Sequence, residues 1–242
     1  MAAAAIECIA ETGSTNAELL QRLRCGESLG EGYWLQALRQ TAGRGRLGRA
    51  WVSEAGNLYS STIVVLGPDD PPPHSLTFVT SLAVYDALRS IVGAKAPIQL
   101  KWPNDVEMDG AKISGILLER AGGTVVVGIG INVAHTPELE SRRTTAISHE
   151  ITGPTPGPGD VLHLLAQCFA DRLAQWRTAG LAAIIADWSD KAHALGEIIA
   201  VSQPGGERLN GSFAGVEPDG ALRLRLADGR TTQIYAGDVG PA

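Results

Sequence analysis

Apolar and polar residues follow one another along this chain in patterns that predict both strands and helices. Leu58–Leu66 and Thr124–Val133 are runs rich in Val and Ile, and they predict buried strands. Ser75–Val92 carries apolar residues at helical spacing and predicts a long helix. Shorter segments predict strands at Tyr33–Arg39, Ile98–Lys101, Val106–Met108 and Ala111–Leu118, and helices at Thr15–Arg24, Asp160–Arg177 and Leu181–Trp188. Because strands and helices do not alternate regularly, the pattern favours an α+β fold.

Two local signals refine this pattern. Asp109-Gly110 separates two predicted strands and is typical of a tight hairpin turn. Thr15 to Glu18 fits a capping box, in which Thr15 is the N-cap and Glu18 stands at the third helical position. We therefore expect the first helix to begin immediately after Thr15.

The pattern changes after about Lys191, where long apolar runs give way to short ones separated by Pro, Gly and Asp. These short runs predict strands at Glu197–Ser202, Arg208–Glu217, Ala221–Leu226 and Thr231–Tyr235. Several short strands at close spacing indicate a small barrel. We therefore divide the chain into two domains, residues 1–190 and residues 191–242.

Composition narrows the classes of function. The formal net charge is −6 and aromatic residues make up 5%, which argues against a generally basic, base-stacking nucleic-acid binder. The three cysteines lie far apart and the five histidines show no metal-ligand spacing, so we predict neither a disulfide framework nor a metal site. The N-terminus lacks a basic region followed by a long apolar run, and we expect a cytoplasmic protein without a membrane partner.

The segment from Gln40 to Trp51 is the first that suggests chemistry. Three arginines provide positive charge that does not titrate, and three glycines allow backbone N–H groups to approach a ligand closely. This combination suits a phosphate or an activated acyl phosphate. The Walker pattern is absent, and Gly43-x-Gly45-x-x-Gly48 alone is a weak dinucleotide signal. A flexible basic loop or a nucleic-acid patch are the alternative interpretations.

Four further segments are candidates for a binding site, each with a purely structural alternative. Lys101–Asp105 is either part of a site or a rigid corner. Lys112–Glu119 places on a strand a lysine that is either a solvated edge charge or a cation aimed into a cleft, and its Gly115 suggests that a ligand or another backbone approaches closely. Gly128–Val133 alternates glycines, which would leave one strand face bare or form a bulge. Glu11–Asn16 precedes a helix, and its polar residues are either caps or contacts for a small polar ring.

Taken together, these five segments resemble the biotin protein ligases, also called biotin–acetyl-CoA-carboxylase ligases. They stand in the order found in that family, and the resemblance covers roughly residues 6 to 235. It implies a mixed-sheet catalytic domain similar to class II aminoacyl-tRNA synthetases, followed by an SH3-like domain. It also implies that MgATP activates biotin as biotinyl-5′-AMP. The biotinyl group then passes to a lysine of a biotin carboxyl-carrier domain.

The resemblance also implies roles for individual residues. It implies a biotin site formed by Ser14, Thr15, Asn16, Gln40, Gly43, Arg44, Gly45, Arg46, Lys112, Gly115, Ile116, Gly128 and Ile131. It implies an ATP site formed by Arg44, Arg46, Arg49, Trp51, Asn104, Lys112, Asn132 and Ala134, with Trp51 near the adenine. In catalysis, Lys112 and Arg46 are expected to neutralise charge that grows at the α-phosphate, while Asp105 orients or deprotonates the acceptor amine.

Several alternatives stay open at this point. Some members of the family carry an N-terminal helix-turn-helix, but Ser14 follows Met1 so closely that we expect no DNA role. A lipoate–protein ligase is the nearest alternative enzyme, and a non-catalytic nucleic-acid-binding module is an alternative of another class. A monomer and a sheet-paired homodimer are both compatible with such a fold, and the sequence does not identify the acceptor carboxylase.

Overall fold

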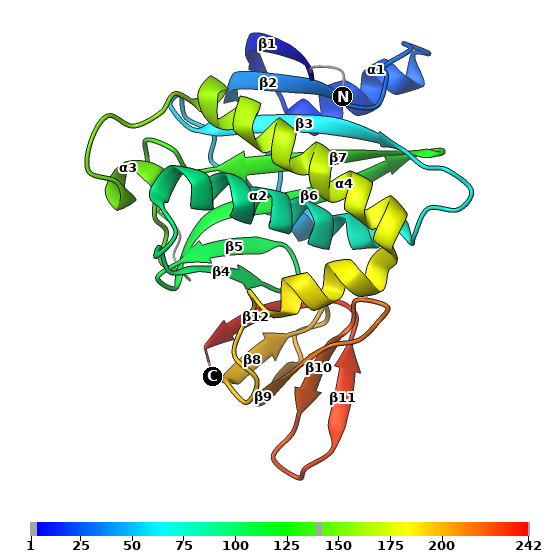
Figure 1. Ribbon diagram of the computed structural model, residues 1–242, viewed down its shortest axis with the longest axis vertical. Coiled ribbons are helices and arrows are strands. Elements are labelled where there is room, and N and C mark those ends of the chain that lie inside the picture. The colour runs from blue at the N-terminus through cyan, green and yellow to red at the C-terminus, as the bar shows by residue number, and fades with distance from the viewer. Residues whose placement is uncertain (1–3, 139–141, 242) are drawn as a thin grey trace.

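The computed structural model describes residues 4–138 and 142–241, so the outer bounds 1 and 242 of the expected domains lie outside the described residues (Figure 1). Its larger sheet has seven strands in the order β1-β2-β3-β7-β6-β5-β4. The strands are β1 (Ala5–Thr12), β2 (Tyr33–Gln40), β3 (Leu58–Val65), β4 (Ile98–Lys101), β5 (Asp105–Met108), β6 (Ala111–Ala121) and β7 (Thr124–Ile131). Only β1 and β2 pair in parallel, so the sheet is mixed.

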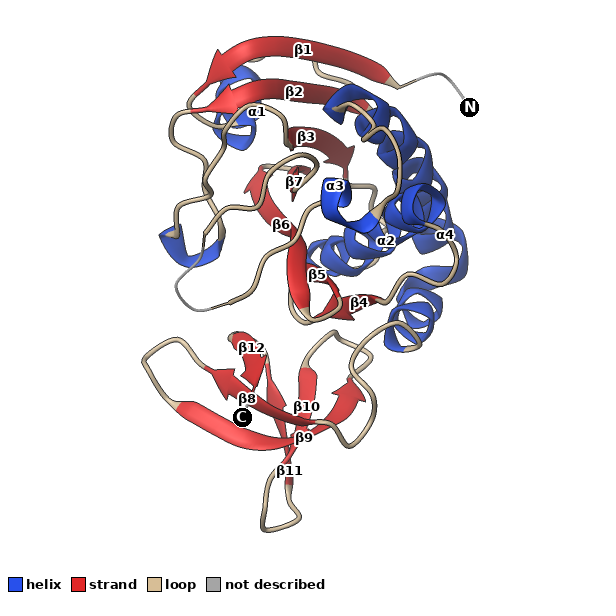
Figure 2. Ribbon diagram, turned by 90° about the vertical axis from the view of Figure 1, so that its left-hand side faces the viewer, coloured by secondary structure: helices blue, strands red, loops and turns tan. Residues whose placement is uncertain are grey.

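Helices cover both faces of this sheet. One face packs against α2 (Leu76–Val92) and α4 (Pro158–Ser189), which form the main core with the apolar side chains of the central strands (Figure 2). The opposite face packs against α1 (Thr15–Arg24) through Leu19 and Leu20. Because α1 is short, it covers only part of its face. The uncovered part of the sheet is where the candidate site lies.

Helix α4 contains both helices that the pattern predicts near its sequence position. Its two arms meet at Gly180, whose φ of 77° lies in the left-handed region that favours glycine. Helix α2 forms much of the core, with residues such as Leu82 and Leu88 fully buried. By length and composition, residues 73–92 could cross a membrane, yet 61% of their most apolar window is buried inside the protein, as in a core helix.

The smaller sheet is antiparallel and follows α4. Its order is β11-β10-β9-β8-β12. The strands are β8 (Ile198–Ser202), β9 (Arg208–Val216), β10 (Leu222–Arg225), β11 (Thr231–Ile234) and β12 (Asp238–Pro241). All four predicted C-terminal strands are present, in a sheet of the SH3-like kind. The α+β fold class with a mixed sheet is therefore confirmed.

The turn between β9 and β10 joins the small sheet to the large one. The buried Trp102 donates its indole N–H to the carbonyl oxygen of Gly220 at 3.1 Å. A Cβ atom at Gly220 would lie 2.8 Å from the ring of Phe78, so only glycine allows this close approach. His74 contacts the carbonyl oxygen of Asp219 through Nε2 at 2.8 Å. The tryptophan of the Lys101–Asp105 segment thus anchors the second sheet.

The capping box predicted at Thr15 is wrong. Ser14 is the N-cap and Thr15 is the first helical residue. The hydroxyl of Thr15 is engaged by Gln40 and Ser61, and Glu18 pairs with Arg22 one helical turn later. Tertiary partners for the Thr15 hydroxyl have taken the place of a local cap.

Three elements were not predicted from the pattern. They are β1, the short helix α3 (Ile147–Glu150) and β12. Strand β1 lies at the edge of the sheet and has no fully buried residue, so its hydrophobic signal is weak. Helix α3 and β12 span only four residues each, too few to show a period. Two 3-10 turns, Arg46–Gly48 and Pro73–Ser75, complete the described elements.

We expect Trp102→Phe to lower the free energy of unfolding by about 1–2 kcal/mol, because the carbonyl of Gly220 loses its donor. Urea unfolding followed by circular dichroism measures this change. Leu195→Ala is the control: the residue is 76% exposed, so the effect should stay within about 0.5 kcal/mol. Equal stability of Trp102→Phe and the wild-type chain would contradict the role of Trp102 in anchoring the small sheet.

Candidate active site

A cavity of about 350 Å³ opens on the sheet face that α1 leaves uncovered. This volume is within the range of pockets for small molecules. Its walls come from the start of α1, the loop between β2 and β3, the β6–β7 hairpin and the loop after β7. The expected site residues among its lining are Ser14, Thr15, Asn16, Gln40, Arg44, Gly45, Arg46, Arg49, Trp51, Asn104, Asp105, Lys112, Gly115, Ile116, Gly128 and Asn132. Segments that are distant in sequence thus meet in one place.

The floor of the cavity consists of strand glycines. Gly115 on β6 lies opposite Gly130 on β7, and neither projects a side chain from the sheet. The indole of Trp51 occupies the space so created. A Cβ atom at Gly130 would lie 2.5 Å from Trp51 Cζ2, and one at Gly115 would lie 2.8 Å from Cζ3. The bare strand face predicted from the alternating glycines is therefore present.

At one end of the cavity, uncharged polar side chains are held by a hydrogen-bond network, in which Asn16 Nδ2 also donates to the Glu119 carboxylate at 2.9 Å. Gln40 Oε1 accepts hydrogen bonds from the backbone N–H of Thr15 at 2.8 Å and from its hydroxyl at 3.2 Å. The buried Ser61 hydroxyl contacts Thr15 Oγ1 at 2.7 Å and Asn16 Oδ1 at 2.6 Å. A Cβ atom at Gly128 would lie 2.4 Å from Asn16 Oδ1, so this glycine makes room for the amide. Each polar group is held in one orientation.

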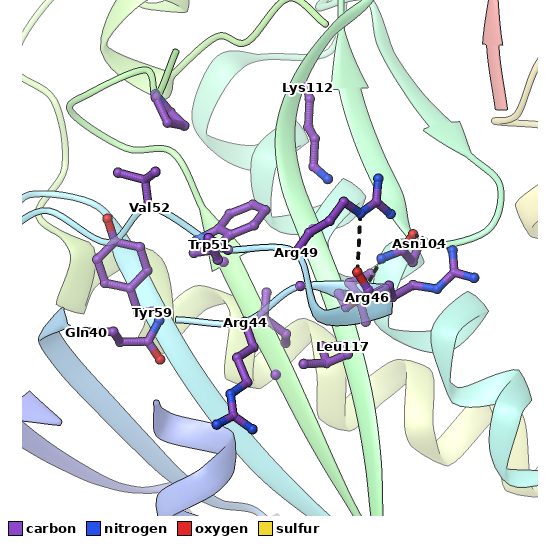
Figure 3. Close-up of a pocket in the computed structure, with 18 of the residues that line it drawn as sticks. Gln40, Arg44, Arg46, Arg49, Trp51, Val52, Tyr59, Asn104, Lys112 and Leu117 are labelled. Carbon is purple, nitrogen blue, oxygen red and sulfur yellow. Dashed lines mark hydrogen bonds between the residues drawn. The ribbon is translucent and has the colours of Figure 1, made fainter. Parts of the chain in front are cut away.

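Charged side chains, among them Lys112, Arg46 and Arg49, line the opposite end of the cavity (Figure 3). Lys112 Nζ lies 2.5 Å from Asp105 Oδ1 and 5.2 Å from the centre of the Trp51 ring. Arg142 binds the second carboxylate oxygen of Asp105. Burial lowers the pKa of Lys112, and the neighbouring Asp105 carboxylate opposes that shift. Figure 3 shows Trp51 between this end, with Lys112 and Arg49, and the end that holds Gln40.

The loop of residues 43–51 closes one side of the cavity. Its two arms are joined by hydrogen bonds from Trp51 N–H to the Gly43 carbonyl at 2.9 Å and from Gly45 N–H to the Arg49 carbonyl at 2.7 Å. Arg49 donates to Asp238 of the small sheet at 3.0 Å. Burial lowers the pKa of Arg46, and the negative charge of Asp238 opposes that shift. The Arg46 guanidinium also donates to Asn104 Oδ1 at 3.3 Å. Both sheets therefore hold the loop.

Residues 12–135 match the Biotin/lipoate A/B protein ligase family, and residues 194–239 match the biotin protein ligase C terminal domain. The biotin–[acetyl-CoA-carboxylase] ligase of Paracoccus denitrificans is 40% identical over 92% of this chain and 95% of its own length. The chain belongs to the biotin/lipoate A/B protein ligase family. The ligase is thus an enzyme of the biotin–[acetyl-CoA-carboxylase] ligase type, which rules against a non-catalytic nucleic-acid module.

Solved structures support the same assignment of the ligase. The biotin protein ligase from Aquifex aeolicus in complex with biotin and ATP matches with a TM-score of 0.83 and 30% identity, over 98% of this chain and 97% of that one. The biotin protein ligase from Leishmania major in complex with biotinyl-5-AMP matches with a TM-score of 0.69 and 25% identity, over 96% and 99% of the two chains. Both matches include the small C-terminal sheet.

Three expected contacts of the ligase are not among the described residues that line the cavity. Ile131 is fully buried in the main core. Gly43 allows the two loop arms to meet, because a Cβ atom there would lie 2.5 Å from the Trp51 carbonyl oxygen. Ala134 lies in the turn after β7, where Asn57 Oδ1 accepts its N–H at 3.0 Å. These three residues therefore support the elements around the cavity but do not line it.

Asn132 lines the cavity, but it also braces the strand that carries Lys112. Its side-chain amide donates to the Thr145 carbonyl at 2.9 Å and to the Lys112 carbonyl at 3.4 Å. Asn132 is 3% exposed. The expected contact of Asn132 with ATP therefore stays a prediction beside an observed structural role. Within the described residues, no group of three or more His, Cys, Asp or Glu is arranged to hold a metal ion.

Other site residues of the ligase were missed by the sequence reasoning. Arg142 and Thr144 line the cavity from a loop without hydrophobic periodicity, and Asp238 reaches the site from the other end of the chain. Tyr59 lines it from β3, where the sequence indicates only a buried strand. The one available signal was the pair Arg142-Arg143 in an otherwise acidic chain, which alone does not distinguish a site from a solvated surface.

We expect Gly130→Ala to push the Trp51 indole off the floor, because a contact of 2.5 Å is shorter than two carbon atoms allow. Acrylamide quenching of tryptophan fluorescence should then increase. Gly123→Ala is the matched control, since a Cβ atom there meets nothing within 4 Å. The difference should vanish in a Trp51→Phe background; a difference that persists there would show that another tryptophan moved.

Proposed function

We propose that this ligase activates biotin as biotinyl-5′-AMP and transfers the biotinyl group to a lysine of a biotin carboxyl-carrier domain. The observation that carries the proposal is the polarity of one cavity. Fixed neutral hydrogen-bonding groups stand at one end and cations at the other, across an apolar and glycine-lined middle. A molecule with a polar ring, an apolar chain and a carboxylate fits this sequence of environments.

The neutral end suits the ureido ring of biotin. That ring has one carbonyl acceptor and two N–H donors, and it needs partners whose orientation is already set. Thr15, Asn16 and Gln40 belong to a network that holds their rotamers through Ser61. The glycine floor then accommodates the apolar part of the ligand where Trp51 now lies. Binding therefore requires the indole to move, which is compatible with its position in a loop.

The cationic end suits the reaction between the biotin carboxylate and ATP. A carboxylate oxygen attacks the α-phosphorus, the bond to the β-phosphate oxygen breaks, and pyrophosphate leaves. Negative charge accumulates in the transition state, where fixed positive charge stabilises it most. Lys112 and Arg46 provide this charge from two different elements. No covalent bond to the enzyme is required.

Mg²⁺ belongs to this proposal as the ion that ATP carries. Mg²⁺ of this kind is typically bound through substrate phosphates and one or two carboxylates, so it would need few protein ligands. The donor set at this end fits phosphate, because Lys112, Arg46 and Arg49 face the cavity. The chemistry that Mg²⁺ supplies is neutralisation of the triphosphate.

Transfer uses the same cavity. The acceptor lysine attacks the carbonyl carbon of the mixed anhydride, an amide bond forms, and AMP leaves. The attacking amine must lose a proton, and Asp105 is the carboxylate at the charged end that can orient or accept it. We place the reaction in the cytoplasm with a biotin-dependent carboxylase as partner. The absence of a DNA role stays a prediction, and a monomer and a homodimer are both compatible with the proposal.

Lys112→Ala should slow biotin-dependent ATP–pyrophosphate exchange by on the order of 10²–10³, because a fixed charge is lost from the transition state. The fold should persist, since Asp105 retains Arg142 as a partner. Lys95→Ala removes the same charge from an exposed turn and serves as the control. Unchanged exchange in Lys112→Ala would overturn the role of Lys112, while absence of exchange in the wild-type chain would overturn the function itself.

Arg46→Ala should weaken retention of biotinyl-5′-AMP more than its synthesis. The loop loses its contacts with Asn104 and with the Gly237 carbonyl, so it opens more easily and the adenylate escapes. The measurement compares biotin on bystander proteins with biotin on the acceptor. Arg39→Ala, which removes an arginine that is 62% exposed, is the control. Labelling of the acceptor alone by Arg46→Ala would contradict this role of the loop.

A further inference from the structure

Asp105 shares its buried carboxylate between two cations. Its side chain is 8% exposed, with Lys112 Nζ 2.5 Å from Oδ1 and Arg142 Nη1 bound to Oδ2. Asp105 is the first residue of β5, Lys112 belongs to β6 and Arg142 to the loop after β7. Each carboxylate oxygen thus has its own counter-ion from a different element.

In the proposed function, Lys112 has to move to the substrates, whereas Arg142 does not. Lys112 must turn from Asp105 towards the carboxylate and phosphate of the substrates. A buried carboxylate that loses its only counter-ion is strongly destabilised. Asp105 would still have a counter-ion after Lys112 moves, because Arg142 donates to its other carboxylate oxygen. The guanidinium gives Asp105 a second positive partner, and its planar set of donors matches the geometry of a carboxylate.

The backbone holds Arg142 beside Asp105 independently of the Lys112 side chain. The Lys112 N–H donates to the Arg143 carbonyl at 2.9 Å, and the Thr145 N–H donates to the Lys112 carbonyl at 3.0 Å. Thr144 thereby pairs with Lys112 as an isolated parallel bridge. The segment that follows Arg142 is therefore tied to β6 by main-chain bonds, which a rotation of the lysine side chain leaves intact.

We infer that Arg142 is a positioning residue: it is the counter-ion that stays with Asp105 when Lys112 moves to the ligand. This inference rests on the proposed function. Without Arg142, Lys112 would be the sole partner of a buried charge and would be held away from the phosphate. With Arg142, Lys112 exchanges one anionic partner for another. Asp105 meanwhile keeps its orientation for the acceptor amine.

The competing explanation is that Arg142 binds the ligand directly, since it also lines the cavity. The two explanations differ in their dependence on Asp105. If Arg142 acts through Asp105, its removal matters only while position 105 carries a charge. If Arg142 touches phosphate, its removal matters whether or not that charge is present. A double-mutant cycle separates these cases.

The experiment measures biotin-dependent ATP–pyrophosphate exchange, so transfer to the acceptor does not enter. The four chains are the wild type, Arg142→Ala, Asp105→Asn and the double variant. We expect Arg142→Ala to lower kcat/KM for ATP by on the order of tenfold, and the double variant to match Asp105→Asn within about twofold. Arg142→Lys should recover part of the loss, because it restores a charge that can reach Asp105.

Controls separate this inference from a folding defect and from failure of the proposed function. Arg143→Ala removes an exposed arginine from the neighbouring position and should leave exchange unchanged. Thermal unfolding checks that each chain folds; if Arg142→Ala does not, Arg142→Gln takes its place. A tenfold loss that persists on the Asp105→Asn background, or no loss in Arg142→Ala, overturns the inference. No biotin-dependent exchange in the wild type overturns the proposed function instead.

Discussion

Paired glycines at the centre of the large sheet are the constraint on which the cavity depends. Gly115 and Gly130 face each other across the β6–β7 hairpin and project nothing from the sheet. The space above them is large enough for the Trp51 indole, which approaches the backbone more closely than any Cβ atom would permit. Because α1 is only ten residues long, no helix fills this space. A binding slot therefore exists where a typical sheet would have core packing.

The charges at one end of the slot are arranged in pairs that a ligand can exchange. Lys112 pairs with Asp105, and Arg49 pairs with Asp238. These carboxylates occupy positions close to where substrate anions are proposed to bind, so the cations are kept paired and oriented before the substrates arrive. Asp238 belongs to the small sheet, which thereby contacts the loop that closes the cavity. This contact gives the C-terminal domain a physical connection to the site.

Much of the fold and site was predictable because the relevant residues are locally unusual. Glycines inside an apolar strand, such as Gly128, stand out from their neighbours and indicate close approach of another group. The hairpin at Asp109-Gly110 follows from turn chemistry, and the buried strands follow from their Val and Ile content. Strand β1 escaped prediction because it lies at the edge of the sheet and has no fully buried residue, so it has little hydrophobic signal.

By itself, the sequence determined the order of the main elements, the two-part α+β architecture and the motifs that form the floor and one wall of the site. Those properties depend on residues close together in the chain, where backbone preference and hydrophobic period act. Only the tertiary structure decided that Arg142 shares the Asp105 carboxylate, that Asp238 pairs with Arg49 in the loop of residues 43–51 and that Trp102 anchors the second sheet. Each of these contacts joins residues that are at least 37 positions apart in the sequence. The strength of an ion pair or hydrogen bond depends on the distance between its partners in space, and the local sequence pattern does not specify that distance.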